Sequence, residues 1–188
     1  MAKSKITRCS WCGTDELYTK YHDEEWGKPT TNEQVLFEFL ILESAQAGLS
    51  WITILRRREN YRKAFADFNP GNVAQFTAED VERLMQDEGI IRNRLKINAA
   101  VTNTILFLQV QKQYGSFYNY LYSFMPDRIP SINPKRLESG PIITNEISDA
   151  ISKDLKKRGF KFFGSIICYA YMQAVGMVND HIENCAFR

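Results

Sequence analysis

The sequence lacks most of the features that mark a secreted, membrane-bound or strongly charged protein. Its 188 residues carry a net charge of only +2, so the overall charge neither requires nor excludes a polyanionic partner. The N-terminal segment 1–8 has no apolar core of the kind that a secretory signal needs. We therefore expect a cytoplasmic protein, whose four cysteines serve as thiols or metal ligands and not as disulfides.

Long apolar runs are also nearly absent. The only one spans 162–178, and it is interrupted by Gly164, Ser165, Gln173 and Gly176. That composition predicts a buried helix and not a membrane span. Because there are no repeats and no low-complexity segments, we expect one domain or two closely packed lobes.

The apolar residues recur at helical spacing, and almost no stretch alternates with a period of two. The sequence therefore predicts an all-α fold. The expected helices run from about 15, from 31 or 32 to a break at Gly48, from Trp51 to a turn at 69–71, from 77 to a connector at 87–92, from there through Leu108, over 117–124, over 146–159 and over 165–175. The stretch 125–145 contains four prolines and predicts an irregular connection.

The stretch 42–51 places a carboxylate and an indole on either side of a helix break. Glu43 closes an apolar run, so in a core helix it lies at the edge of hydrocarbon, where a lone charge is costly. Gly48 can end that helix in a left-handed conformation, and Ser50 can cap the next one. The stretch therefore predicts a pocket lined by Glu43 and Trp51.

Aromatic residues gather between positions 9 and 27. On a helix that begins near Asp15, Tyr18, Tyr21 and His22 stand three and four residues apart and share a face. Packing of a small subdomain explains such a cluster as well as a binding site does, and the residues alone leave both interpretations open.

Residues of the types that bind metal stand near both ends of the chain. His181 and Cys185 are four residues apart, and the only other histidine, His22, follows Cys9 by thirteen residues. Two cysteines and two histidines would form a closed tetrahedral site that joins the two ends, and such sites are structural. The alternative is a surface His–Cys pair and an unrelated N-terminal cluster. Cys12 could replace one ligand or stay a free thiol.

A glycine, Gly89, separates two of the predicted helices. A tight helical hairpin of this kind can direct backbone N–H groups toward a phosphate, with Arg92, Arg94 and Lys96 adding positive charge. Many helical hairpins have a glycine and nearby basic residues without binding nucleic acid, so this pattern alone is weak.

Several separated motifs together resemble the 3-methyladenine DNA glycosylase I family. They are Cys9, Tyr18–Asp23 with Glu25–Gly27, Leu42–Glu43 with Gln46–Trp51, Lys156–Phe162, and Val178–His181 with Cys185. The resemblance covers nearly the whole chain. It implies a helix-hairpin-helix glycosylase, with a zinc site joining the N- and C-terminal segments, that flips out 3-methyladenine from alkylated DNA and excises it by hydrolysis.

The resemblance also implies roles for individual residues. The base-binding positions are Tyr18, Tyr21, Glu43 and Trp51, with Glu43 also the catalytic candidate. The hairpin at Gly89 falls on the DNA-anchoring element. The positions of other residues add DNA-binding candidates: Leu49 at the helix break, a candidate wedge in the base stack, and Ile90, Arg92 and Arg94 at the hairpin. The ligands of one structural zinc ion per chain are Cys9, His22, His181 and Cys185.

The chemistry of the lesion supports these roles. A purine methylated on a ring nitrogen is cationic in DNA, so its glycosidic bond is already weakened. Such a base stacks well on Trp51 and on tyrosine rings, where cation–π attraction contributes roughly 0.5–2 kcal/mol. Glu43 can accept hydrogen bonds from the purine edge and complement its charge, which an ordinary adenine does not offer.

In strand-cleaving relatives of this superfamily a lysine nucleophile stands in the hairpin region, which falls near Asn93 here. Lys96 lies one turn further, so we expect a monofunctional enzyme that uses water and leaves an abasic site. Residues 1–188 are expected to form one monomeric unit of two helical lobes that binds damaged double-stranded DNA, with about 70–115 carrying the hairpin. The alternatives are a zinc-stabilised DNA-binding module without catalysis and a glycosylase for another alkylated base.

Overall fold

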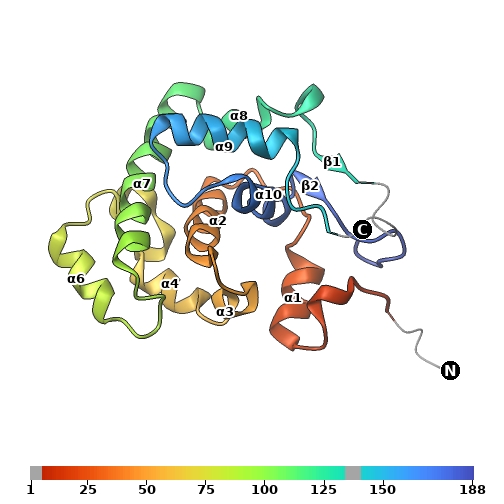
Figure 1. Ribbon diagram of the computed structural model, residues 1–188, viewed down its shortest axis with the longest axis horizontal. Coiled ribbons are helices and arrows are strands. Elements are labelled where there is room, and N and C mark those ends of the chain that lie inside the picture. Colours follow the sequence, from red (N-terminus) through yellow and green to blue (C-terminus); the bar gives the residue numbers. More distant parts are fainter. Residues whose placement is uncertain (1–5, 134–140) are drawn as a thin grey trace.

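The structure is a computed structural model that describes residues 6–133 and 141–188 (Figure 1). It is mostly helical, as the sequence predicts. In chain order the α-helices are α1 (Glu16–Glu24), α2 (Glu33–Gln46), α3 (Trp51–Leu55), α4 (Arg58–Ala64), α5 (Pro70–Val73), α6 (Ala78–Gln86), α7 (Arg94–Tyr114), α8 (Phe117–Tyr122), α9 (Glu146–Arg158) and α10 (Ser165–Ala174). Short 3-10 helices span Ser10–Cys12, Ala66–Phe68 and Pro126–Arg128, and the strands are β1 (Ser131–Ile132) and β2 (Val178–Asn179). Residues 134–140, part of the predicted irregular connection, lie outside the described residues.

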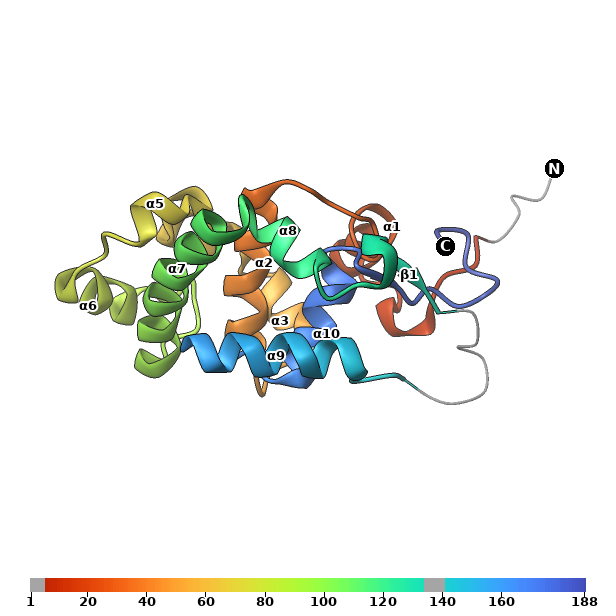
Figure 2. The ribbon, with the colours of Figure 1, turned by 90° about the horizontal axis from the view of Figure 1, so that it is seen from above.

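Helix α2 forms the centre of the fold. Its residues 36–45 are all buried, and it contacts α3, α4, α7, α8 and α10. A helix that is apolar on all sides needs neighbours on all sides. Helices α5, α6 and α7 lie at one end of the long axis, and α1 lies with both termini at the other (Figures 1 and 2). The C-terminal end of α2 therefore lies between two groups of helices.

The region after Trp51 corrects one prediction. Two helices, α3 and α4, meet at Arg56–Arg57 where one continuous helix was expected. The predicted turn at 69–71 is instead the start of α5, because the Asn69 side chain accepts a hydrogen bond from Asn72 N at 3.1 Å and Pro70 occupies the first helical position. An asparagine followed by proline is also a helix start, so this sequence signal has two meanings.

The break between α2 and α3 agrees with the prediction at Gly48, whose φ is +80°. Ser50 stands at the N-cap position of α3, but its hydroxyl lies 2.6 Å from Thr53 Oγ1 and caps no backbone N–H. The prediction that Ser50 occupies the N-cap position is therefore confirmed, but its side chain does not make the capping hydrogen bond.

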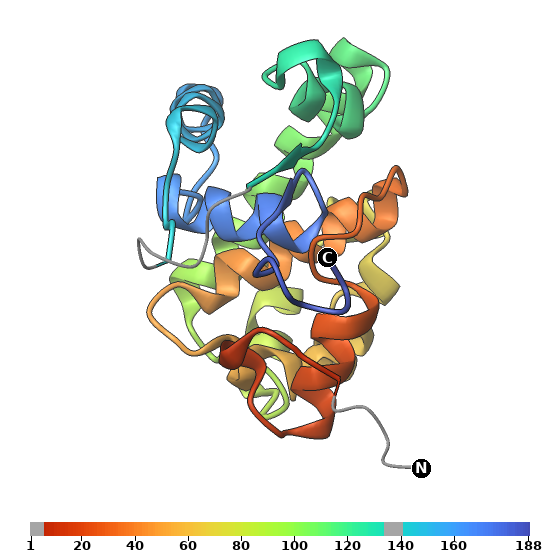
Figure 3. The same cartoon turned by 90° about the vertical axis from the view of Figure 1, so that its right-hand side faces the viewer.

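Two short strands, β1 and β2, form a parallel pair that the all-α prediction omits. Strands of two residues are too short to show an alternating pattern in the sequence. The C-terminal segment that follows β2 turns back beside the N-terminal segment (Figure 3), where Ala186 N donates to Thr7 O at 3.0 Å. Within the described ranges, no helix is long and apolar enough to cross a membrane.

Helix α1 is fastened to α2 and α4 by largely buried ion pairs. Arg58 on α4 lies 2.7 Å from Glu25, directly after α1, and 2.7 Å from Glu38 on α2. Glu38 is only 3% exposed, and a carboxylate so buried needs such partners. The ring of Tyr21 on α1 accordingly lies 6.3 Å from the ring of Phe39 on α2. The network thus holds the aromatic face of α1 against α2.

Candidate active site

A cavity of about 470 Å³ lies between α1, α2, α3 and α10, and a cavity of this size can hold a nucleobase. Its lining residues are Cys9, Ser10, Trp11, Tyr18, Tyr21, Trp26, Glu43, Gln46, Trp51, Pro141, Ala170, Gln173 and Ile182. The structure therefore brings all four predicted base-binding residues to one cavity.

Aromatic rings form much of the cavity wall. Asp15 caps α1 by accepting a hydrogen bond from Tyr18 N at 3.1 Å, and the helix presents Tyr18 and Tyr21 on one face, as predicted. The Tyr21 ring lies 5.4 Å from the Trp51 ring, and the Trp11 ring meets Tyr18 edge-on at 5.0 Å. Because aromatic faces attract cations, these walls suit a flat, positively charged ligand.

The loop between α2 and α3 is held by a lysine from α7. Lys96 Nζ donates to Ala45 O at 2.8 Å and to Ala47 O at 2.6 Å. Carbonyl groups at a helix C-terminus have no partner within the helix, so the lysine acts as a cap. Gln46 Nε2 donates to Leu49 O at 2.6 Å and closes the loop. The predicted wedge, Leu49, is therefore connected to the predicted hairpin helix.

Glu43 is the most unusual group in the cavity. It is 3% exposed, and no described residue donates a hydrogen bond or forms an ion pair with its carboxyl group. Burial raises the pKa of Glu43 from 4.5 to about 8, because desolvation penalises the charged form. In the free protein at neutral pH the group is therefore largely an uncharged acid, which resolves the cost of placing a carboxylate at the end of an apolar helix.

Two indole groups of the cavity also lack partners. Trp11 Nε1 and Trp51 Nε1 are buried, and neither has a hydrogen-bond acceptor in the part of the chain that the structure describes. A buried N–H group without a partner costs about 1–3 kcal/mol. Residues with unpaired polar groups that line one cavity with Glu43 favour a site that is completed by a ligand.

Sequence reasoning assigned no role to several lining residues, among them Trp11, Trp26, Gln46 and Gln173. Trp11 stands between two cysteines, and its spacing carries no signal for a cavity. Gln173 carries a stronger signal, because a polar side chain in the most apolar helix predicts a buried partner. The sequence does not identify that partner.

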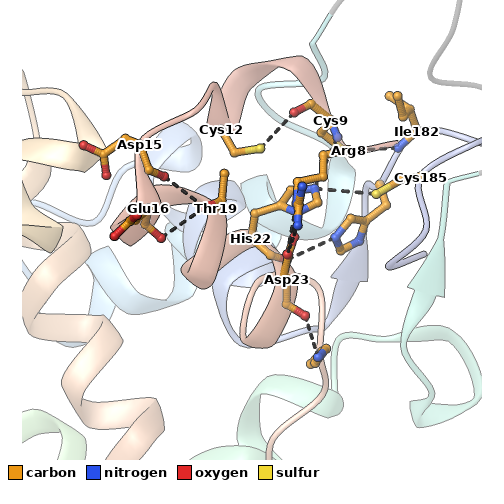
Figure 4. A network of polar contacts seen from close by, with 12 residues as sticks. Arg8, Cys9, Cys12, Asp15, Glu16, Thr19, His22, Asp23, Ile182 and Cys185 are labelled. Atoms are coloured by element: carbon orange, nitrogen blue, oxygen red, sulfur yellow. Dashed lines mark hydrogen bonds and ion pairs between the residues drawn. The ribbon is translucent and has the colours of Figure 1, made fainter. Parts of the chain in front are cut away.

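Cys9, His22 and Cys185 form a buried group whose ligand atoms all lie within 4.8 Å of one another. His22 Nε2 lies 3.6 Å from Cys185 Sγ (Figure 4). Its other ring nitrogen lies 2.8 Å from Asp23 Oδ1, and Arg8 donates three hydrogen bonds of 2.7–2.9 Å to that carboxylate. A carboxylate behind a histidine orients the ring, and here the far nitrogen, Nε2, points to the two cysteines and accepts a hydrogen bond from Cys9 N at 3.3 Å.

The other two candidate ligands lie beside this group. His181 is fully buried, its ring centroid is 4.8 Å from that of His22, and its Nδ1 lies 2.9 Å from Asn179 Oδ1. Cys12 Sγ donates to Cys9 O at 3.1 Å and lies outside the group. The structure thus gathers three of the four predicted ligands and places the fourth next to them.

The predicted DNA-binding glycine lies in the connection between α6 and α7. Gly89 N donates to Asp87 Oδ1 at 2.8 Å, and the adjacent Ile90 is buried. A Cβ at position 89 would lie 2.8 Å from Asn60, so close packing against α4 requires glycine here.

The two predicted DNA-binding arginines are about half exposed. Arg94 pairs with Glu82, and Arg92 lies 3.5 Å from Glu88. Exposed ion pairs are weak, so both guanidinium groups can exchange their carboxylates for phosphates at small cost.

The chain matches the sequence profile of the family described as methyladenine glycosylase over residues 11–188. DNA-3-methyladenine glycosylase 1 of Escherichia coli strain K12 is 50% identical over 180 residues, which cover 96% of each chain. A crystal structure of a 3-methyladenine DNA glycosylase I superposes with a TM-score of 0.90 at 49% identity, covering 96% of this chain and 98% of the other. The structure of 3-methyladenine DNA glycosylase I from Staphylococcus aureus, described for its recognition of 3-methyladenine, gives 0.91 at 38% identity and covers 96% of both chains.

The raised pKa of Glu43 predicts how a substitution changes stability with pH. Between 4.5 and about 8 the folded protein binds a proton that the unfolded chain lacks, so Glu43 lowers the unfolding free energy by about 1.4 kcal/mol per pH unit. An amide does not titrate. Glu43→Gln should therefore be more stable than the original protein, by a margin that grows as pH rises across this window, in urea unfolding at several pH values. The exposed Glu59→Gln is the matched control, and a margin for Glu43→Gln that does not change with pH would contradict the prediction.

Proposed function

The chain belongs to the methyladenine glycosylase family, and from this membership we propose that its aromatic cavity receives a flipped 3-methyladenine and that the enzyme hydrolyses the N-glycosidic bond of that base in alkylated DNA. The product is an abasic site. One observation carries the proposal above all others, namely the buried and unpaired carboxyl group of Glu43 among aromatic rings.

The charge state of Glu43 provides selectivity. A purine methylated at N3 is cationic while it is attached to DNA, and a positive charge within about 4–6 Å lowers the pKa of a carboxyl group. The arriving lesion therefore converts Glu43 to a carboxylate, which forms a charge-assisted contact with the base. Unmodified adenine carries no charge and leaves Glu43 a neutral acid.

The aromatic walls of the cavity also favour the cationic base. Tyr21 and Trp51 lie close enough to present neighbouring ring faces, and Trp11 with Tyr18 forms a second aromatic surface. Cation–π attraction of roughly 0.5–2 kcal/mol favours the methylated base over the neutral one.

Water is the attacking group in the proposed reaction. Its oxygen bonds to C1′ of the sugar, its proton leaves to solvent, and the base departs with the electron pair of the glycosidic bond. As that bond breaks, positive charge moves from the base to the sugar, where the carboxylate of Glu43 stabilises it. The departing base is then neutral, so its contact with Glu43 weakens and release is favoured.

A lysine nucleophile is not needed and has no suitable candidate in the hairpin. The amino group of Lys96 is committed to two carbonyl oxygens at the end of α2. Asn93, which stands near the position where strand-cleaving relatives have the lysine, caps the N-terminus of α7: its side chain accepts a hydrogen bond from Lys96 N at 3.1 Å. Both observations support a monofunctional enzyme.

The proposed DNA-anchoring element is a helix-hairpin-helix made of α6, the connection 87–93 and α7, in which α6 and α7 contact each other. In this proposal about 70–115 form one lobe of a single unit spanning 1–188, and the N- and C-terminal segments form the other. Arg92 and Arg94 bind phosphates, and Leu49 fills the space left by the flipped base. We propose that the chain acts as a monomer.

We further propose one structural zinc ion, held by Cys9, His22, His181 and Cys185. The donor set fits, because two thiolates and two imidazoles make a closed tetrahedral site in which ligand atoms stand roughly 3–4 Å apart. The separation of 3.6 Å between His22 and Cys185 lies in this range. The ion would fasten α1 to the C-terminal segment, and His22 shares that helix with the two tyrosines of the cavity.

Glu43→Gln should abolish most base release while preserving the fold and DNA binding. A neutral amide cannot become the carboxylate that complements the cation, so we expect a loss of about 10²-fold or more. The measurement is chromatography of the bases that the protein releases from methylated DNA, with Glu59→Gln as the matched control. Binding to an abasic duplex, followed by fluorescence anisotropy, reports DNA affinity separately.

Unchanged release by Glu43→Gln would remove Glu43 from the base-binding role. Release of 7-methylguanine in place of 3-methyladenine would contradict the substrate. A folded original protein that binds DNA and releases no base would instead establish a DNA-binding module without catalysis.

The zinc proposal predicts that Cys185→Ser loses the metal and part of the stability. We expect the free energy of unfolding to fall by about 4 kcal/mol, which corresponds to a decrease of roughly 10 °C in Tm for a chain of this size. Metal analysis and thermal unfolding are the measurements. Two control variants should retain one zinc ion per chain. They are Cys168→Ala, at a buried position of α10, and Cys12→Ala. Retention of zinc and of Tm by Cys185→Ser would exclude Cys185 as a ligand, and loss of zinc from Cys12→Ala alone would assign that ligand position to Cys12.

A further inference from the structure

The cavity contains a second polar side chain that the proposed function does not yet use. Gln173 lies on α10 and lines the same cavity as Glu43, together with one apolar residue of that helix, Ala170. Its backbone carbonyl accepts a hydrogen bond from Gly27 N at 2.9 Å, so the residue is fixed at the junction of α10 with the segment that follows α1. The side-chain amide remains to be explained.

Asp180 determines which way that amide points. Asp180 is fully buried, and its Oδ2 accepts hydrogen bonds from Gln173 Nε2 at 2.5 Å and from Tyr169 OH at 2.8 Å. Its Oδ1 accepts one from Asn133 Nδ2 at 2.6 Å. The opposite amide orientation would place two oxygen atoms 2.5 Å apart in a buried site, which is strongly repulsive. The NH₂ group of Gln173 therefore faces Asp180, and its carbonyl oxygen is left for the cavity.

The amide orientation of the other glutamine at the cavity, Gln46, is also fixed by a hydrogen bond. Gln46 uses its NH₂ group to donate to Leu49 O at 2.6 Å. Neither glutamine can turn its amide to suit a different ligand without breaking a hydrogen bond. The cavity thus offers the fixed carbonyl oxygens of two glutamines, and these acceptors favour a purine edge that donates hydrogen bonds.

Charge alone does not select adenine. 3-Methyladenine and 3-methylguanine are both cationic in DNA and carry the methyl group at the same ring nitrogen, so Glu43 and the aromatic walls attract both. The two bases differ at C6, where adenine has an amino group and guanine a carbonyl oxygen, and at C2, where only guanine has an amino group. A fixed acceptor is able to separate them, because a carbonyl facing a carbonyl leaves two buried acceptors unpaired.

We propose that Gln173, oriented by Asp180, is a specificity-determining residue whose amide oxygen accepts a hydrogen bond from the exocyclic amino group of 3-methyladenine. The same oxygen repels the C6 carbonyl of 3-methylguanine. This role rests on the proposed glycosylase function and adds a choice between two cationic lesions. Asp180 is a positioning residue, since it acts through the amide of Gln173.

The test compares single-turnover release of 3-methyladenine and of 3-methylguanine from methylated DNA. Gln173→Met removes the amide at similar size, so release of 3-methyladenine should fall about tenfold while release of 3-methylguanine stays the same or rises. Gln109→Met, at an exposed position of α7, is the matched control and should leave both rates unchanged. Gln173→Leu repeats the test should the methionine variant not fold.

Asp180→Asn tests the direction of the effect. With an amide at position 180, the side chain of Gln173 can turn its NH₂ group into the cavity, so the ratio of the two rates should move further toward 3-methylguanine. Metal content and thermal unfolding of this variant confirm that the neighbouring His181 and the fold are intact.

A fall in both rates by the same factor in the Gln173 variants would show a purely structural role and overturn the inference. An unchanged ratio in a folded Asp180→Asn protein would overturn the orienting role of Asp180. Failure of the proposed function is distinguishable, because the original protein would then release neither base.

Discussion

The burial of one carboxyl group governs the chemistry of this protein. Glu43 stands at the end of the most buried helix, where desolvation raises its pKa to about 8 and no described neighbour offers a compensating charge. The other two buried carboxylates of the described residues have partners: Glu38, on the same helix, pairs with Arg58 and Arg62, and Asp180 accepts three side-chain hydrogen bonds. The absence of such a partner at Glu43 leaves room for a positive charge supplied by the ligand. A methylated purine in DNA supplies that charge, and normal bases do not.

The rest of the fold serves to hold rings and polar groups around this carboxyl group. Ion pairs from α4 fix α1 against α2, and the buried Cys–His group ties α1 to the C-terminal segment. Both constraints act on the helix that carries Tyr18 and Tyr21. Lys96 adds a third constraint, because it joins the predicted DNA-binding hairpin to the loop that precedes Trp51.

The family resemblance supplied the base-binding role of Tyr18 and Tyr21, which line the cavity with Glu43 and Trp51. The residues themselves identified the helical class, the break at Gly48 and the pairing of Glu43 with Trp51. These succeeded because each depends on local patterns: apolar spacing, a glycine with positive φ, and a carboxylate that ends an apolar run. The same reasoning failed at 69–71, where asparagine and proline start a helix as well as a turn, and at the two-residue strands, which are too short for any pattern. Trp11 and Gln173 were out of its reach for another reason. The cavity that they line is built from segments far apart in the sequence, and only the three-dimensional arrangement brings those segments together.

The most direct test of the account is the protonation state of Glu43 with and without a cationic base. Infrared difference spectra between the original protein and Glu43→Gln isolate the carboxyl absorption of this residue. The permanently cationic 3,9-dimethyladenine serves as the ligand, and neutral 9-methyladenine serves as its control. The account predicts a protonated acid in the free protein at neutral pH, conversion to a carboxylate with the cation, and no conversion with the neutral base. A carboxylate already present in the free protein, or an acid that stays protonated with the cation bound, would contradict it.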